Sequence, residues 1–262
     1  MKIKIITMVT LLLFVASPAL SDTYYIWDTW GGAYADAEKT APNTDDDLLC
    51  WAAASSNILE YTGWGMVGGM TNTDQIFAHF QTHWTDQGGN SLFGFNWWFD
   101  GVNDQQGVPG WAQEDVDGGG GFYPSLNHDD YTRWTSNDVT ALQTLDDWMH
   151  DGYGTTISIS GGMAHAITAW GFETNDAGRY TAIFVSDSDD NKSGPTYPDT
   201  LRRYGLRYSG SAWYLIGGYY GDGTTNYISE VCGLQIIPVP GAFLLGILGL
   251  GAAGLKLRRK HA

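Results

Sequence analysis

The sequence predicts an α+β domain in which helices come first along the chain and antiparallel strands follow. Residues 45–83 have the composition of helices, with a Gly-rich turn at 63–69 between them. Beyond residue 150, segments rich in β-branched and aromatic residues are separated by turn residues, which is typical of strands. Helices and strands that segregate along a chain favour an α+β arrangement over alternating βα units.

Three helices are expected. The first begins at Cys50 in "CWAAASSNILEY", whose Ala and Ser content is typical of a buried helix with close neighbours. The second covers "NTDQIFAHFQTH", with Thr73 as N-cap, and the third follows Ser136 as N-cap and ends at Gly152. Between them, the Trp- and Gly-rich region 84–135 has little periodicity and is expected to form loops along a cleft.

Five segments are expected to be strands: 155–160, 165–173, 180–187, 212–220 and 227–237. The sequence "TNDAG", residues 174–178, supplies a tight turn between the second and the third of them. A hairpin that turns there brings the end of its second strand beside the start of its first strand.

Cys50 is the candidate nucleophile. The positive end of the helix that it opens lowers the pKa of a thiol, whereas the preceding Asp45–Asp47 act in the opposite direction, so a cationic partner is needed. His165 is the candidate partner because it follows "SGGMA", residues 160–164, and opens an apolar strand, where there is room around its side chain. The predicted hairpin brings Asp187 or Asp189 toward the far side of its imidazole. These residues would supply the nucleophile, base and orienting carboxylate of a Cys–His hydrolase.

Two metal sites are also considered. His79 and His83 are four residues apart on a predicted helix, but residue 80 is Phe where a zinc peptidase motif has Glu. The acidic stretch from Asp187 is similar to a calcium loop, but Lys192 and Pro198 stand where an EF-hand needs Gly and Glu. Only a looser cation site remains open there.

The N-terminus indicates export. A short basic region, an apolar run over 5–15 and small residues near position 21 are typical of a secretory signal peptide over residues 1–21. The apolar run is shorter than the ~20 residues that a membrane-spanning helix needs. In an exported protein, a disulfide between Cys50 and Cys232 is an alternative that would leave no free nucleophile.

The C-terminal residues 238–262 carry a short Pro motif, an apolar segment and a basic tail. This tail resembles the PEP-CTERM sorting signals of envelope-bearing bacteria, with Val-Pro-Gly-Ala at 239–242. The resemblance implies transient membrane association, removal by an exosortase-type processing enzyme, and a location at the cell envelope, cell surface or extracellular matrix. A permanent single-span anchor is the alternative.

The region between these ends, 22–237, is expected to be one strongly acidic domain. The whole chain has a formal net charge of −16; without the two ends, seven of the 13 Lys and Arg and all 29 Asp and Glu remain, for a net charge of −22. Such a charge argues against nucleic acid as a partner.

The motifs "DDLLCWAAASSNILEY" and "HAITAWGFETNDAGRYTAIFVSDSDDN" resemble, in this order, those of the immunoglobulin-degrading streptococcal cysteine peptidases. The resemblance covers about residues 39–235. It implies a papain-like fold, with the nucleophile helix packed on a C-terminal antiparallel sheet. It also implies that Cys50 is the nucleophile, His165 the base and acid, and Asp187 the group that orients His165, with support from Asp189.

The same family places a lysine shortly before the cysteine, where it contributes to the oxyanion hole. Lys39 in "EKTAPNTDDDLLC" is the counterpart that the resemblance implies. Region 84–135 does not follow the family, so its antibody specificity is not implied.

The sequence as a whole predicts an exported cysteine endopeptidase that cleaves polypeptide substrates through a Cys-His-Asp triad and an acyl-enzyme, without a cofactor. One alternative is a thiol amidase or acyltransferase that uses the same residues. The other is a surface- or matrix-binding protein whose Trp-rich region is the binding face. The reactivity of the Cys50 thiol distinguishes an enzyme from a binding protein.

Overall fold

The computed structural model describes residues 21–40, 45–103, 105, 107–116, 118–136, 139–190 and 200–237. The expected signal peptide, apart from Ser21, the expected sorting signal at 238–262 and the later part of the calcium-like loop lie outside the described residues. Within the described ranges, no helix has the length and apolar character needed to cross a bilayer.

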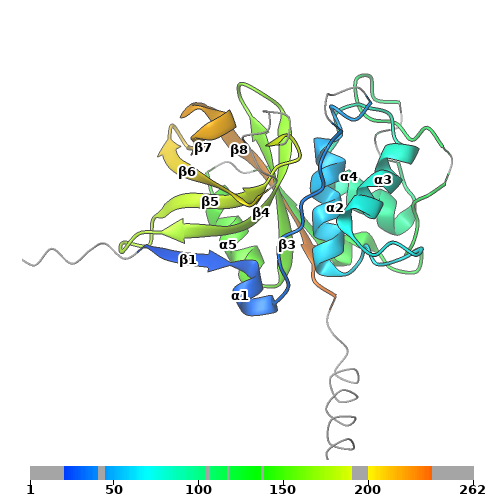
Figure 1. Ribbon diagram of the computed structural model, residues 1–262, viewed down its shortest axis with the longest axis horizontal. Helices are drawn as coiled ribbons and strands as arrows, with labels where there is room; N and C mark the ends of the chain where they lie inside the picture. Colours follow the sequence, from blue (N-terminus) through cyan, green and yellow to red (C-terminus); the bar gives the residue numbers. More distant parts are fainter. Residues whose placement is uncertain are drawn as a thin grey trace, which may run out of the picture.

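Helices α2, α3 and α4 form a group beside a strongly curved sheet (Figure 1). The helices are α1 (Ile26–Trp30), α2 (Cys50–Thr62), α3 (Thr73–His83), α4 (Ser91–Asp100) and α5 (Ala141–His150). The strands are β1 (Asp22–Tyr25), β2 (Thr132–Thr135), β3 (Tyr153–Ser160), β4 (His165–Thr174), β5 (Tyr180–Ser186), β6 (Arg202–Ser209), β7 (Ala212–Ile216) and β8 (Asp222–Gln235). Two short 3-10 turns, η1 (His128–Asp130) and η3 (Gly218–Tyr220), complete the described elements.

Six of the strands close into an antiparallel barrel. Their order is β4-β3-β8-β7-β6-β5, and β5 pairs back to β4; β1 and β2 add to β4 and β8. The expected fold class, an α+β papain-like fold with a helical part on an antiparallel sheet, is therefore wrong, because the sheet is mostly a closed barrel. Register shifts in the β3–β8, β4–β5 and β7–β8 pairs explain the closure, since such irregularities bend strands and increase their twist.

Closure also depends on a strand that the sequence did not predict. Strand β6 pairs with β5 on one side and with β7 on the other. It therefore connects the predicted β4–β5 hairpin to the last two strands, β7 and β8. The expected strand 212–220 is shorter than predicted. Strand β7 ends at Ile216, and a Gly-rich turn with the 3-10 turn η3 follows.

The predicted loop region 84–135 contains helix α4 instead of only loops. Asn90 caps the helix by accepting a hydrogen bond from the Leu92 backbone N–H, and Gly101 ends it in the left-handed region, with φ of 72°. Its large side chains are buried on nearly all sides: Phe95, Trp97, Trp98 and Phe99 have no exposed surface. An element buried on all sides lacks the one-sided periodicity that reveals a surface helix, which explains the wrong prediction.

The ends of the other helices differ slightly from the prediction. The N-cap of α3 is Asn72, whose side chain accepts from the Gln75 backbone N–H, and not Thr73. Helix α5 begins at Ala141, five residues after the expected N-cap Ser136.

The β4–β5 hairpin is confirmed and it positions the site. Its turn is held by backbone hydrogen bonds between Asn175 and Arg179 and between Gly178 and Asn175. Thr168 of β4 is opposite Ser186 of β5. The residues that follow β5 therefore lie beside the start of β4, close to the N-terminus of α2.

Candidate active site

Cys50 is the first residue of α2 and lies where the helical group meets the barrel. A helix N-terminus carries partial positive charge. Burial by itself would raise the pKa of the Cys50 thiol, but the His165 charge and hydrogen bond, the Lys39 charge and the Ala166 backbone N–H together lower it. The thiol is thus in an environment that favours the thiolate.

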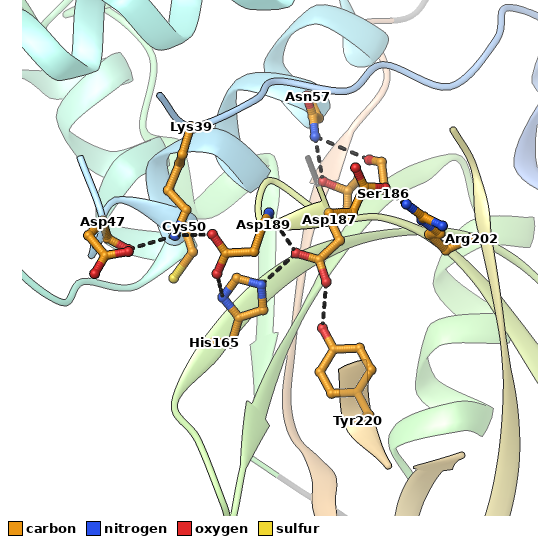
Figure 2. A network of polar contacts seen from close by, with 12 residues as sticks. Lys39, Asp47, Cys50, Asn57, His165, Ser186, Asp187, Asp189, Arg202 and Tyr220 are labelled. Carbon is orange, nitrogen blue, oxygen red and sulfur yellow. Dashed lines mark hydrogen bonds and ion pairs between the residues drawn. The ribbon is translucent and has the colours of Figure 1, made fainter. Parts of the chain in front are cut away.

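His165 and Asp187 form a buried pair. The imidazole Nε2 lies 2.7 Å from Asp187 Oδ1, and the side chains are 5% and 2% exposed. The imidazole lies between Asp187 on one side and Cys50 and Asp189 on the other (Figure 2). Burial would lower the pKa of His165, but Asp187 and Cys50 raise it well above its usual value. These shifts favour an imidazolium beside a thiolate.

Asp187 is itself held by two further donors. Tyr220 donates its hydroxyl to Oδ2 at 2.8 Å, and the Asp189 backbone N–H donates to Oδ1 at 3.1 Å. Burial would raise the pKa of Asp187, but His165 and these two donors lower it. The carboxylate therefore remains ionised opposite the imidazole. Tyr220 is not among the predicted site residues, because the composition of "GGYY" predicts the end of a strand.

Lys39 and Asp189 form a second pair next to the first. Lys39, which is 1% exposed, places Nζ 2.7 Å from Asp189 Oδ1 and donates to the Asp47 backbone carbonyl at 2.6 Å. The other carboxylate oxygen, Oδ2 of Asp189, lies 3.7 Å from His165 Nδ1. Asp189 thus links the lysine to the imidazole, and all five predicted residues come together (Figure 2).

The acidic run before Cys50 helps to hold this lysine segment. Asp46 is buried and accepts from the Thr40 backbone N–H at 2.7 Å and from Gln81 Nε2 at 2.7 Å. Asp47 contributes its carbonyl to Lys39. The run therefore ties the chain around Lys39 to the start of α2, and its carboxylates are not among the groups that shift the pKa of Cys50.

A polar network on the next turns of α2 locks the helix to the barrel. Asn57 donates to Thr168 Oγ1 of β4 at 3.0 Å and to Ser186 Oγ of β5 at 3.2 Å. Trp170 donates its indole N–H to the same Ser186 hydroxyl at 2.9 Å. Because Asn57 is on the helix that begins at Cys50, these bonds fix the thiol relative to His165 and Asp187.

The thiol and the imidazole open onto a cavity of about 600 Å³. Asn90 and Trp111 line it from the helical side, and Ser158, Met163 and Glu230 line it from the barrel side. The cavity is of the size that holds small molecules or peptide side chains.

The structure also bears on the alternative roles of the cysteines and of the histidine pair. Cys50 and Cys232 are both free, so the disulfide alternative is wrong. Cys232 is buried on β8, where burial and the nearby Glu230 raise its pKa to about 12. His79 Nε2 lies 2.6 Å from the Gly119 carbonyl, and His83 Nδ1 lies 2.8 Å from the His79 carbonyl.

Two groups of described residues could offer three ligand atoms to a metal ion. One is His165, Asp187 and Asp189; the other is Asp36, Glu38 and Asp190. In the first group the imidazole and Asp187 are already hydrogen-bonded to each other. In the second, Asp190 pairs with Arg202 at 2.7 Å. His79 and His83 belong to neither group.

No protein-family model and no curated protein matches the chain. Its function is therefore inferred from the chemistry of the site.

Proposed function

We propose that the chain is a cysteine endopeptidase that cleaves peptide bonds through Cys50, His165 and Asp187. One arrangement carries this proposal: the thiol at the N-terminus of α2 lies beside an imidazole whose charge lowers the thiol pKa, and the imidazole Nε2 lies 2.7 Å from a buried carboxylate. This is the arrangement that activates a thiol nucleophile and supplies a proton donor beside it. The resemblance of the Cys50 and His165 motifs to immunoglobulin-degrading cysteine peptidases supports the same assignment.

In the first half of the reaction, the Cys50 thiolate attacks the scissile carbonyl carbon and the carbonyl electrons move to oxygen. The oxyanion is stabilised by the Cys50 backbone N–H at the start of α2 and by the positive charge of Lys39 nearby. His165 then gives its Nδ1 proton to the leaving nitrogen as the C–N bond breaks. An amine leaves and a thioester remains on Cys50.

In the second half, neutral His165 takes a proton from water at Nδ1, and the hydroxide adds to the thioester carbon. The C–S bond breaks, the acid product leaves, and the thiolate–imidazolium pair is restored. Asp187 keeps Nε2 protonated throughout, which leaves Nδ1 as the atom that exchanges protons. Asp189 holds Lys39 in place.

We also propose that the protein acts outside the cytoplasm of a bacterium, at the cell envelope, cell surface or extracellular matrix. The support is the signal-like pattern of residues 1–21 and the sorting-like pattern of residues 238–262. An exosortase-type enzyme would remove the tail after transient membrane association. The partner of the mature domain would be a polypeptide substrate. The net charge of −22 on the mature domain argues against nucleic acid as a partner.

The proposal is tested by labelling the purified protein with iodoacetamide from about pH 4 to about pH 9, with peptide mass spectrometry as the readout. Cys50 should react rapidly well below neutral pH, and His165→Ala should abolish this reactivity. Cys232, buried and with its pKa raised to about 12, serves as an internal control that should label slowly. An ordinary thiol profile at Cys50 would contradict the enzyme assignment and favour the binding protein.

A second measurement separates peptidase from other thiol chemistry. A peptide library derived from a digested proteome should yield new termini with the wild-type protein and none with Cys50→Ala. A reactive Cys50 without any cleaved peptide would instead support the amidase or acyltransferase alternative.

A further inference from the structure

Glu230 lies in the same cavity as Cys50 and His165, two strands away from the imidazole. Ala166 of β4 is opposite Ser158 of β3, and Ser158 is opposite Glu230 of β8. Residues opposite one another on neighbouring strands point to the same face of a sheet. His165 precedes Ala166 on β4, so its side chain leaves the strand on the other face, but it is the first residue of the strand and lines the same cavity as Ser158 and Glu230. At about 4.8 Å between strands, Glu230 is on the order of 10 Å across the sheet from β4. That distance is within reach of a substrate side chain bound near the scissile bond.

The Glu230 carboxylate is fixed from both sides of the cavity through one oxygen. Oε2 accepts from Asn90 Nδ2 at 2.8 Å and from Ser158 Oγ at 3.0 Å. Asn90 belongs to the helical side, where it also caps α4, and Ser158 belongs to the barrel. Among the described residues, Oε1 of Glu230 has no hydrogen-bond partner. The second oxygen is therefore the acceptor that the cavity offers to a ligand.

Carboxylates outnumber Lys and Arg side chains in the described lining of the cavity, which favours a cationic ligand. Its described lining includes the carboxylates of Asp47, Asp189 and Glu230 but no Lys or Arg. Asp189 is neutralised by Lys39 from behind the lining. Among the described residues, no cation pairs with Glu230 in this way. A partly desolvated carboxylate gains most from a positively charged partner.

The rim supplies apolar contacts for the stem of a long cationic side chain. Trp111 and Leu48 line the cavity and are 40% and 45% exposed. Lys and Arg pack their methylene stems on such surfaces while the charged group reaches a polar partner. An exposed indole also attracts a cation directly.

We propose that Glu230 is a specificity-determining residue, which selects polypeptide substrates with a Lys or Arg side chain at the first or second residue before the scissile bond. The inference rests on the proposed peptidase function. The simpler role for Glu230, in which it only ties the helical side to the barrel through Asn90 and Ser158, predicts no preference for charge.

The test uses peptidyl chloromethyl ketones on the purified protein, with the labelling rate of Cys50 as the readout. In each probe the Cys50 thiolate displaces chloride, so a C–S bond forms, chloride leaves, and no peptide bond needs to be cleaved. Paired probes carry Lys or norleucine at the first or second residue before the ketone. Norleucine has the same methylene stem as Lys but lacks the amine.

The variants are Glu230→Gln and the control Asp176→Asn. Glutamine keeps an oxygen that can accept from Asn90 and Ser158 but removes the charge. Asp176 is an exposed carboxylate in the turn between β4 and β5, so its substitution removes one charge from the protein away from the cavity. The norleucine probe checks that the cavity of Glu230→Gln is intact.

In the wild-type protein and in Asp176→Asn, the Lys probe should label Cys50 about tenfold faster than the norleucine probe at one of the two positions. A tenfold ratio of rates corresponds to a free-energy difference of about 1.4 kcal/mol. In Glu230→Gln this ratio should fall below about twofold, while the norleucine rate stays unchanged. The wild-type ratio should also fall as salt is raised, because salt screens the attraction.

Equal rates for the two probes in the wild-type protein, or a Lys preference that survives in Glu230→Gln, would overturn the role of Glu230. If iodoacetamide still labels Cys50 rapidly below neutral pH and the protein still cleaves the peptide library, the proposed function stands in spite of that result. If Cys50 also reacts like an ordinary thiol with iodoacetamide, both proposals fail.

Discussion

Tyr220 and Asp187 are joined by a hydrogen bond of 2.8 Å, donated by the phenol to Oδ2, while His165 contacts the other oxygen of the same carboxylate. The phenol comes from the 3-10 turn η3 between β7 and β8, and both side chains are buried. Each oxygen of Asp187 therefore has its own donor, which prevents the carboxylate from rotating away from the imidazole. Tyr220 is a positioning residue in the proposed mechanism.

We expect Tyr220→Phe to lower kcat/KM by about tenfold while the protein remains folded, since a hydrogen bond to a charged group contributes about 1.5–3 kcal/mol. The pKa of Asp187 should rise, because a donor that lowers it is lost. Steady-state kinetics across pH measures the effect. Tyr214→Phe on β7 is the control: its ring packs against Tyr227, and its kcat/KM should equal that of the wild type. Equal kinetics for both variants would show that the phenol does not position Asp187.

The activity of the wild-type protein should follow a broad bell-shaped pH profile. It rises as pH passes the lowered pKa of Cys50, where the thiolate forms, and falls as pH passes the raised pKa of His165, where the imidazolium loses its proton. Because Cys50 and His165 interact, the acidic and the alkaline limb report apparent pKa values of the pair and not of either residue alone. Asp187→Asn removes a charge that raises the pKa of His165, so its alkaline limb should move to lower pH.

Asp187→Asn should also reduce kcat by roughly a hundredfold or more, because the imidazole of His165 loses the carboxylate that fixes its tautomer. Asp189→Asn provides the comparison, since Asp189 lies 3.7 Å from Nδ1 and does not bind Nε2. Its alkaline limb should move less. A larger shift in Asp189→Asn than in Asp187→Asn would reverse the proposed roles.

Lys39→Met should raise the pKa of Cys50, because the lysine charge is one of the causes that lower it. The iodoacetamide labelling profile of Cys50 should then move to higher pH. Arg202→Met is the matched control: Arg202 is another cation near the site, but it pairs with Asp190 and is not among the groups that lower the Cys50 pKa. An unchanged profile in Lys39→Met would show that this charge does not support the thiolate.

Gly161→Ala should destabilise the loop that leads into His165. Gly161 has φ of +113°, and a Cβ there would lie 1.9 Å from the Thr225 carbonyl oxygen, so the backbone must move. We expect the free energy of unfolding to fall by about 3 kcal/mol, measured by denaturant titration. Gly178→Ala separates strain from crowding, because its φ is +69° but nothing lies within 4 Å of the added Cβ. That control should lose only about 1 kcal/mol.

Much of the site could be predicted because its signals are local. The turn at 174–178 supports a hairpin by its residue types alone, and a hairpin brings the end of one strand beside the start of the other. This local geometry is enough to predict that Asp187 or Asp189 lies beside His165. The position of Cys50 before an Ala-rich helix is likewise visible in the sequence, and helix α2 does begin there.

The sequence by itself therefore determined the residue types of the site, the helix that opens at Cys50 and the hairpin that carries His165 and Asp187. Only the tertiary structure decided the closed barrel, the helical state of α4, and the contacts of Tyr220 and Glu230 with residues far away along the chain. Turn chemistry and periodicity act over a few residues. The pairing of β5 with β6, the burial of α4 on all sides, and the meeting of Asn90, Ser158 and Glu230 depend on contacts that form only when distant segments pack together.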